Sequence, residues 1–492
     1  MSNLSHAVAG TDSAPFSMRA IIGPLMAIVV GMIMVILDST VMNIALPVLM
    51  EDFGSTVNTM QWSITAYTLA LSAVIPLAGW LTDRFGAKQI FMITILLFTA
   101  GSVLCSFATT PEQLIVYRII QGIGGGMVQP IGMAIIFKLA PPNKQGAVMG
   151  MLGIPMMLGP ALGPVLGGYL LEYATWHWIF LINLPIGIIA IMAGLRYLPR
   201  VERRTVPRLD IGGILLAPIA FATLSYAFSE AGEDWGATTT LVSLGIGIVA
   251  LVWFIIVELR HEQPLLELRV FKSFDFSVGI VASWLSTMAL FGSFLFVPMY
   301  MQQVFGYEPL KTGFMILPQV AMTGVFMPIG GKIFDKYGAR GVSVVGISLV
   351  AVGMFYMSQI QADSDAGFLI GATMFMGAGM GLSMMPINTH ILKVAPRRLV
   401  GRVTPLTSAA QQVVVSFAVA GLASYMSSRL IDHMATSEGD QVGPMVAAFG
   451  DTFFVAGCIA VVGALLAILL RKPKVAYDTS DDGIEAPVMM GH

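Results

Sequence analysis

Two charged residues stand in stretches that are otherwise apolar, and their types suggest proton chemistry. Asp38 lies in ILDSTVMNIALPVL and Arg118 in RIIQGIGGG. An ionised side chain surrounded by hydrocarbon costs several kcal/mol unless it is paired, protonated or wet. Burial disfavours the charged form of a carboxyl group, so Asp38 could bind and release a proton near neutral pH. The alternative is a structural hydrogen-bond acceptor within a helix bundle.

Arg118 is the only other charge deep inside an apolar stretch, and Asp38 is the only acid available to it. Helix counting puts Asp38 about 20 Å and Arg118 about 9 Å below the same polar surface. Direct pairing therefore requires the arginine side chain to reach inward, through Gln121 or water. A purely structural arginine is the competing interpretation.

The elements that hold these residues must lie in lipid. Of the 492 residues, 11% are charged and 56% are hydrophobic, and the mean hydropathy is +0.81. A soluble protein carries about 25% charged residues, so a water-soluble enzyme, a DNA-binding protein and a secreted scaffold are excluded. Cys105 and Cys458 both lie in apolar stretches, which argues against a disulfide framework or a metal cluster. We expect no cleaved signal peptide, because the first twenty residues contain no apolar run before a small-residue site.

Apolar runs long enough to cross a bilayer, which needs about 20 residues, predict an all-α membrane protein with fourteen spans. They lie near 21–47, 58–81, 89–108, 113–137, 146–171, 177–197, 210–229, 238–257, 276–301, 312–334, 341–360, 366–392, 405–428 and 451–470. With this count, all but three of the 26 Lys and Arg fall on one side, the exceptions being Lys311, Arg429 and Arg118. The positive-inside bias therefore predicts a multi-pass protein of the inner membrane with both termini in the cytoplasm.

An internal repeat divides these spans. GWLTDRFGAKQ (79–89) is echoed by GKIFDKYGARG (331–341), and GIGGGMVQP (122–130) by GAGMGLSMMP (377–386). We predict two six-helix bundles, 21–200 and 273–471, with two inserted helices and their loops at 201–272 and cytoplasmic tails at 1–20 and 472–492. Repeats of this kind are typical of transporters that bind substrate between the halves. The alternative is that all cytoplasmic turns look alike.

The fifth span is rich in glycine and proline. It reads GMLGIPMMLGPALGPVLGGYL (150–170), and its candidate gating residues are Gly159, Pro160, Gly163, Pro164, Gly167 and Gly168. Glycines at four-residue spacing let backbones approach, and prolines kink the helix. Plain helix packing is expected in any case, and a hinge or gate at the interface between halves is the further prediction.

The loops at 79–88 and 331–341 carry acidic and basic residues at matching positions. A charge latch that breaks as the halves move is one interpretation, and simple positive-inside topology is the other. The latch candidates are Gly79, Asp83, Arg84, Gly86, Lys88, Asp335 and Arg340.

Several polar or aromatic residues at mid-membrane depth could contact a transported molecule, although helix–helix hydrogen bonding or core packing explains each of them as well. These candidates are Asn43, Gln61, Trp62, Tyr67, Gln129, Trp284, Gln319, Asn388, Gln411 and Gln412.

No phosphate loop, zinc-binding His pair or catalytic triad pattern occurs in the sequence. We therefore expect neither an enzyme nor a bound cofactor or metal. An ion gradient, a partner or the substrate's own gradient must then drive any transport.

Five motifs together resemble the signatures of the fourteen-span drug:proton antiporters of the major facilitator superfamily, EmrB/QacA type. They are LDSTVMNIALP (37–47), GWLTDRFGAK (79–88), RIIQGIGGG (118–126), GPALGPVLGG (159–168) and WHWIFLINLPIG (176–187). The span count covers the whole chain, whereas the motifs cover the first six spans. The resemblance implies alternating access coupled to protons through Asp38 and Arg118, a latch that includes Asp83, Arg84 and Lys88, and outward transport.

One feature departs from the resemblance. Some relatives that expel cationic drugs carry acids in the thirteenth span, where this chain has Gln411 and Gln412. Dicationic substrates are therefore disfavoured relative to neutral, zwitterionic, anionic or monocationic lipophiles.

The combined prediction is a proton-driven multidrug exporter that confers antibiotic resistance. Its expected partners are protons, a lipophilic small molecule and membrane lipids, with no nucleic acid, and it is expected to act as a monomer. A periplasmic adaptor is left open. The alternatives are a proton symporter that imports a small organic solute and a lipid-handling membrane protein or receptor without coupled transport.

Overall fold

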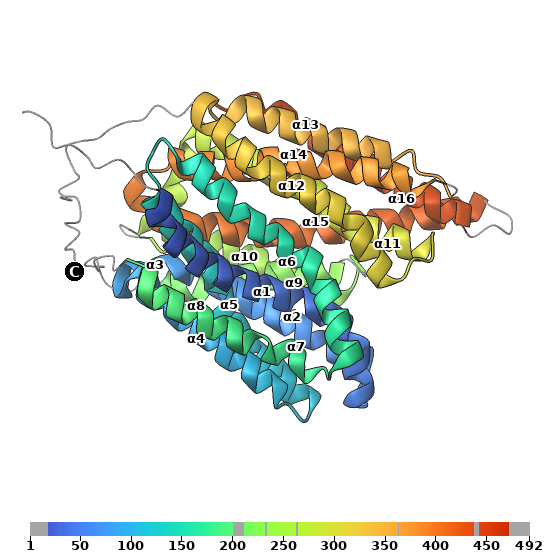
Figure 1. Ribbon diagram of the computed structural model, residues 1–492, viewed down its shortest axis with the longest axis horizontal. Coiled ribbons are helices and arrows are strands. Elements are labelled where there is room, and N and C mark those ends of the chain that lie inside the picture. Colours follow the sequence, from blue (N-terminus) through green and yellow to red (C-terminus); the bar gives the residue numbers. More distant parts are fainter. Residues whose placement is uncertain are drawn as a thin grey trace, which may run out of the picture.

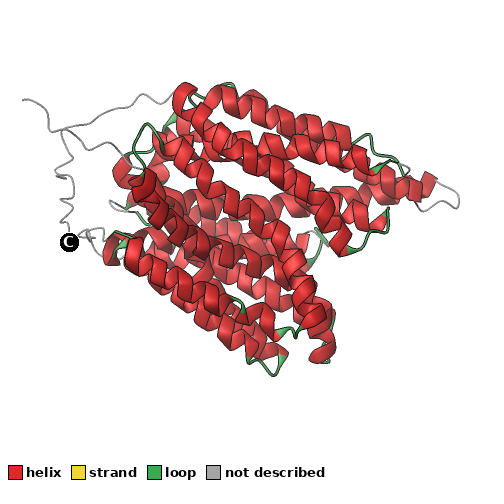
Figure 2. Cartoon of the chain, viewed as in Figure 1, coloured by secondary structure: helices red, strands yellow, loops and turns green. Residues whose placement is uncertain are grey.

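The structure is a computed structural model that describes residues 18–199, 211–231, 234–261, 264–362, 364–436 and 442–471, and it holds these residues in helices and short connections without strands (Figure 2). The pattern of long apolar runs between short polar breaks accounts for this, because helices satisfy every backbone polar group internally.

The helices fall into three sequential groups. The N-terminal bundle contains α1 (Met18–Asp52), α2 (Val57–Val74), α3 (Leu77–Phe85), α4 (Ala87–Ser106), α5 (Pro111–Leu139), α6 (Gln145–Tyr173), α7 (His177–Leu181) and α8 (Asn183–Tyr197). The inserted pair is α9 (Ile211–Ala231) and α10 (Thr238–Arg260). The C-terminal bundle contains α11 (Phe274–Gln303), α12 (Pro309–Tyr337), α13 (Ala339–Met357), α14 (Ala366–Val394), α15 (Val400–Thr436) and α16 (Val442–Ala467), with 3₁₀ turns at Leu268–Lys272 and Arg397–Leu399.

Among the described residues, 11 helices are long and apolar enough to span a membrane, and the bent pair α2–α3 makes up to 12. The bend of this pair is 55°. It falls at Ile75 and Pro76, where the proline lacks the backbone N–H that would continue the helical ladder. The last helix also differs from the expected span, because α16 begins at Val442 rather than near 451.

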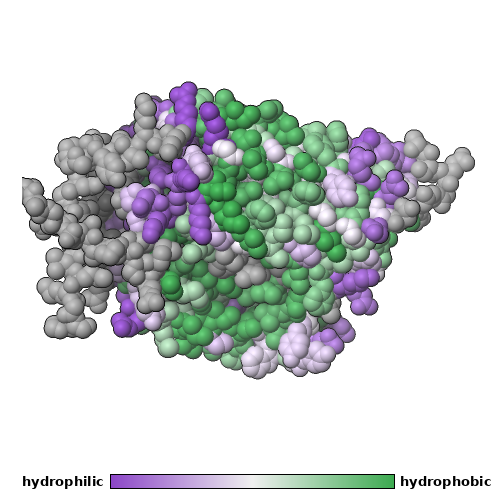
Figure 3. All heavy atoms as spheres, turned by 45° about the horizontal axis from the view of Figure 1, so that its top comes forward, coloured by the Kyte–Doolittle hydropathy of each residue, from purple (hydrophilic) through white to green (hydrophobic). Residues whose placement is uncertain are grey.

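The surface shows an apolar band between two polar ends (Figure 3). We call the end that carries Lys88, Lys332 and Lys393 the basic end, and the end that carries Asp52 and Glu112 the acidic end. An apolar band that meets lipid has no need of charged side chains, which explains the low charge content of the chain.

Glycines set the contacts within each bundle in the same way. In α5, a Cβ at Gly122 or Gly126 would meet the backbone of α2, and one at Gly124 would meet the backbone of α4. In the corresponding stretch of α14, Gly377 and Gly381 lie against the backbone of α12, and Gly379 lies against the backbone of α13. The repeated glycine motifs therefore let the middle helix of each bundle approach two neighbours closely.

The two bundles lie side by side, with α4 and α8 on one side of the molecule and α13 and α14 on the opposite side (Figure 1). They meet through α6 against α12 and α14, and through α15 against α3 and α5. The inserted helix α9 contacts α10, α2 and α15, so it touches both bundles.

Candidate proton site and the contacts between bundles

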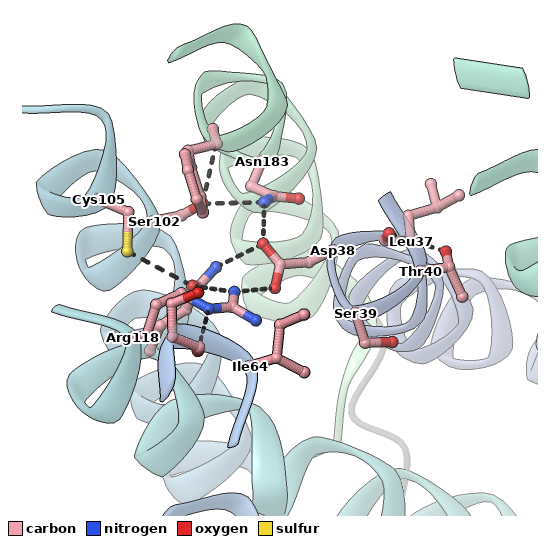
Figure 4. Close-up of polar contacts among 12 residues, drawn as sticks. Leu37, Asp38, Ser39, Thr40, Ile64, Ser102, Cys105, Arg118 and Asn183 are labelled. Atoms are coloured by element: carbon pink, nitrogen blue, oxygen red, sulfur yellow. Dashed lines mark hydrogen bonds and ion pairs between the residues drawn. The ribbon is translucent and has the colours of Figure 1, made fainter. Parts of the chain in front are cut away.

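Asp38 is at the centre of a buried polar network in the N-terminal bundle (Figure 4). One carboxylate oxygen accepts a hydrogen bond from Arg118 Nη1 at 2.5 Å. The other accepts hydrogen bonds from Gln121 Nε2 at 2.7 Å and Asn183 Nδ2 at 3.1 Å. Asp38 is 2% exposed and Arg118 is 0% exposed. The arginine therefore pairs directly with the carboxylate, and Gln121 bridges them as well.

The guanidinium group is held from several sides. Gln121 Oε1 accepts from Arg118 Nη1 at 2.7 Å, and the Ser63 carbonyl accepts from Nε at 3.3 Å. The Tyr67 ring lies 3.9 Å from the guanidinium carbon. Ser63 and Tyr67 belong to α2, so this helix is bound to the charge on α5 through a backbone hydrogen bond and an aromatic face.

Asn183 is a site residue that the sequence reasoning missed. It begins α8 and also donates to Ser102 Oγ on α4 at 2.9 Å, while Ser102 donates to the Phe180 carbonyl at 2.9 Å. The signal was present, because Asn183 is the polar residue of an apolar run inside the quoted motif WHWIFLINLPIG.

Hydrogen-bond donors surround the Asp38 carboxylate. Three side chains donate hydrogen bonds to Asp38, and one of them carries a full positive charge. A proton on Asp38 would remove the negative charge that compensates Arg118. Because a buried charge without its partner costs several kcal/mol, protonation would favour a rearrangement that gives Arg118 another partner or water.

At the basic end, one aspartate from each bundle reaches the first turn of a helix in the other bundle. Asp83, in α3, forms an ion pair with Arg402 of α15, with 3.2 Å between Oδ2 and Nε. Asp335, in α12, accepts hydrogen bonds from the backbone N–H groups of Gly146 at 2.8 Å and Ala147 at 2.9 Å in α6. Acids are stabilised at helix N-termini, so both contacts hold the bundles together at this end.

Close glycine contacts accompany the two aspartates. A Cβ at Gly79 would lie 2.8 Å from the Gly401 carbonyl oxygen, and a Cβ at Gly331 would overlap Gly146. The repeat therefore places equivalent contacts on both sides of the interface, which is more than similar turns alone would produce.

The basic residues of the same loops bind within their own bundles. Lys88 donates to the carbonyls of Leu195 at 2.8 Å and Leu198 at 2.7 Å, at the end of α8. Arg340 donates to the Leu470 carbonyl, just after α16, at 3.0 Å. Lys88 and Arg340 thus each bind the end of the last helix of their own bundle. Arg84, the remaining basic candidate of the first loop, is exposed.

Glycines supply the turns that follow the two aspartates. Gly86 has a φ of 93° and Gly338 a φ of 88°, a backbone region that glycine adopts readily. Each residue ends one helix and begins the next, α3 to α4 and α12 to α13.

The glycine-rich part of α6 faces its own bundle. Cβ atoms at Gly159, Gly163 and Gly167 would meet Ile36, Thr40 and Val41 of α1, whereas Gly168 has open space. The glycines of α6 that approach the C-terminal bundle come earlier and are Gly146, Gly150 and Gly153. The side chains of Pro160 and Pro164 lie outside the described part of the structure.

The predicted substrate residues do not gather at one place in the described structure. Tyr67 packs on Arg118, Gln319 is buried in α12, and Gln411 donates to Thr287 of α11 at 2.5 Å. Trp284, Asn388 and Gln412 are half-buried, Gln61, Trp62 and Gln129 are exposed, and the Asn43 side chain lies outside the described part.

The long apolar helices, with paired glycine, acid and base contacts between two bundles, are those of a multi-pass membrane protein. Residues 28–419 match the model of the Major Facilitator Superfamily, and the chain belongs to that family. It is accordingly a multi-pass membrane transporter and not an enzyme.

Relatives with curated names include drug-resistance proteins. A multidrug resistance protein B homolog of Mycobacterium tuberculosis is 36% identical over 78% of this chain and 72% of its own length. The lincomycin resistance protein LmrB of Listeria monocytogenes is 31% identical over 89% and 94%. The tetracenomycin C resistance and export protein of Streptomyces glaucescens is 32% identical over 92% and 91%.

Solved structures share the fold. The proton:xylose symporter XylE matches with a TM-score of 0.64 at 17% identity, over 93% of this chain and 98% of that one. At this identity the likeness concerns the fold alone.

Proposed function

We propose that this transporter exports lipophilic drugs or other toxic compounds in exchange for protons. The observation that carries the proposal is the buried ion pair of Asp38 and Arg118. A carboxylate can bind and release a proton, and here its charge is balanced by the guanidinium inside the bundle. Two relatives, 31% and 36% identical, are named as drug-resistance proteins, and a third, 32% identical, is named as a resistance and export protein. These names support outward transport of drugs.

In the proposed cycle, proton binding to Asp38 weakens its attraction to Arg118. The guanidinium then shifts against Ser63 and Tyr67, and the movement passes to α2 and α3. Because α3 carries Asp83, the shift strains the ion pair with Arg402 between the bundles. Opening of the basic end would follow proton binding, and closure would follow proton release.

The proposed topology has fourteen spans in the inner membrane, of EmrB/QacA type, with both termini in the cytoplasm. The 29 residues of α6 and the 21 residues of α9 are long enough to add two spans to the twelve described above. The basic end is then cytoplasmic. The proposed acting unit is a monomer that works with protons, substrate and lipid.

The experiment is a drug-susceptibility panel in an efflux-deficient host, including lincomycin and ethidium, for wild type and Asp38→Asn. We expect wild type to raise resistance and Asp38→Asn to lose it at equal expression, because an amide cannot cycle a proton. Asp432→Asn, an exposed acid at the acidic end, is the matched control and should keep resistance.

Everted vesicles separate export from the alternatives. Uptake of a panel compound that requires an acidic lumen and stops with a protonophore supports antiport. Loss of compound from vesicles under the same gradient would indicate a symporter, and activity that survives the protonophore would refute proton coupling.

A further inference from the structure

A cavity lies next to the inserted helix α9. Its volume is about 290 Å³, near the lower end of the range for small-molecule pockets. All three parts of the fold form its walls: α1 and α2 of the N-terminal bundle, inserted α9, and α15 of the C-terminal bundle. Its polar lining residues are Gln61, Thr65, Thr68, Ser225, Tyr226 and Ser416.

One buried polar group in this wall has no hydrogen-bond partner among the residues that the structure describes. Ser225 is 3% exposed, and its hydroxyl makes no hydrogen bond to any described residue. A buried hydroxyl without a partner costs about 1–3 kcal/mol. Because Ser225 lines the cavity, a molecule in the cavity is the available source of that hydrogen bond.

The other hydroxyls indicate what kind of molecule would fit. Thr68 and Ser416 donate to carbonyls of their own helices, at 3.0 Å and 3.2 Å, so their oxygens are left to accept from a ligand. The described residues that line the cavity include no charged side chain, and Leu46, Ile64 and Leu69 give it apolar walls. An apolar molecule with N–H or O–H donors matches this lining.

Aromatic rings and one acid stand at the side of the cavity that is nearer the acidic end. Trp62 stacks on Tyr226, with 5.9 Å between ring centroids and 25° between planes. Tyr226 also interacts with the carboxylate of Glu230, one turn further along α9. A flat aromatic amine with at most one positive charge can use the rings, the acid and the hydroxyls together.

We propose that this cavity binds the exported substrate, as an aromatic lipophile that donates hydrogen bonds, and that inserted helix α9 supplies part of the binding site. The inference rests on the proposed export function. It gives the inserted pair a role, because a protein of this fold without α9 would lack one wall of the cavity.

Helix α2 connects the cavity with Asp38. Ile64 and Thr68 line the cavity, while the Ser63 carbonyl and the Tyr67 ring contact Arg118. A ligand in the cavity and a proton on Asp38 therefore act on the same helix, which provides a physical link between substrate and proton.

The test measures equilibrium binding to the purified full-length protein in detergent. Ethidium, a flat cation with two aromatic amines, is the donor probe, and tetraphenylphosphonium, which has no N–H, is its comparison. Ser225→Ala removes the hydroxyl, and Ser225→Phe fills the cavity. Leu215→Phe, on the exposed face of the same helix, is the matched control.

We expect Ser225→Ala to raise the Kd for ethidium about three- to tenfold, as expected for one hydrogen bond, and to leave tetraphenylphosphonium binding unchanged. Ser225→Phe should abolish saturable ethidium binding, and Leu215→Phe should retain it. Ser225→Phe with wild-type ethidium affinity would overturn the proposal, and so would equal weakening of both probes by Ser225→Ala.

Two further outcomes would overturn this proposed binding site without refuting the export function, which the susceptibility panel tests separately. One is the absence of saturable ethidium binding to the wild type. The other is a bound lipid, detected by mass spectrometry, that Ser225→Phe removes and ethidium does not displace.

Discussion

Asp335→Asn tests whether the contacts at the basic end hold the two bundles together. In the structure, this carboxylate accepts hydrogen bonds from two backbone N–H groups at the start of α6, those of Gly146 and Ala147. Asparagine keeps one acceptor oxygen but loses the charge and brings an NH₂ group against the same donors. The closed basic end should therefore become less stable relative to an open one.

The magnitude follows from these two contacts. Hydrogen bonds to charged groups contribute about 1.5–3 kcal/mol each, and an acid at a helix N-terminus adds about 0.3–1 kcal/mol. Because asparagine keeps one acceptor oxygen, it retains part of this stabilisation. We therefore expect the closed state to lose about 2 kcal/mol, which corresponds to about a thirtyfold change in the ratio of closed to open molecules.

Spin labels at Phe85→Cys in α3 and Tyr337→Cys in α12 report this ratio, since both positions are exposed at the basic end of different bundles. Cys458 is exposed and is replaced by serine in all variants, whereas Cys105 is buried. We expect a longer distance population to grow in Asp335→Asn. The neighbouring exposed Lys336→Gln is the control and should match the wild type.

An unchanged distance distribution in Asp335→Asn would refute the reasoning, because the two backbone contacts would then contribute nothing to closure. Equal shifts in Asp335→Asn and Lys336→Gln would mean that general charge at this end, rather than the contact with α6, controls opening.

Substitutions at Arg118 and Gly163 test the interior of the N-terminal bundle. Arg118→Ala should abolish gradient-driven export, because Asp38 loses the charged donor that pairs with it inside the bundle. Arg118→Lys should restore export in part, and wild-type export by Arg118→Ala in everted vesicles would show that the arginine only braces α5. Gly163→Leu should abolish transport or folding, because its side chain would push α6 off α1, whereas Gly168→Leu, which has open space, should be tolerated. Wild-type transport and thermal stability in Gly163→Leu would contradict the close packing.

The sequence alone was sufficient to predict an all-helical membrane protein. Hydropathy and charge are local properties, and the cost of placing a charge in lipid applies wherever the chain folds. The same cost singled out Asp38 and Arg118, the charged pair that the structure brings together. The echo of GWLTDRFGAKQ in GKIFDKYGARG likewise indicated Asp83 and Asp335 as related positions.

Only the tertiary structure decided which partners these residues have. Asn183 donates to Asp38, and Arg402 pairs with Asp83. The Ser63 carbonyl accepts from Arg118. The two members of each pair come from segments far apart in sequence, and no local pattern relates them. A membrane helix can be apolar on both its lipid face and its protein face, so periodicity does not reveal which side meets a neighbour. For this reason the orientation of the α6 glycines toward α1, and the placement of α9 beside α2 and α15, required the packed bundle.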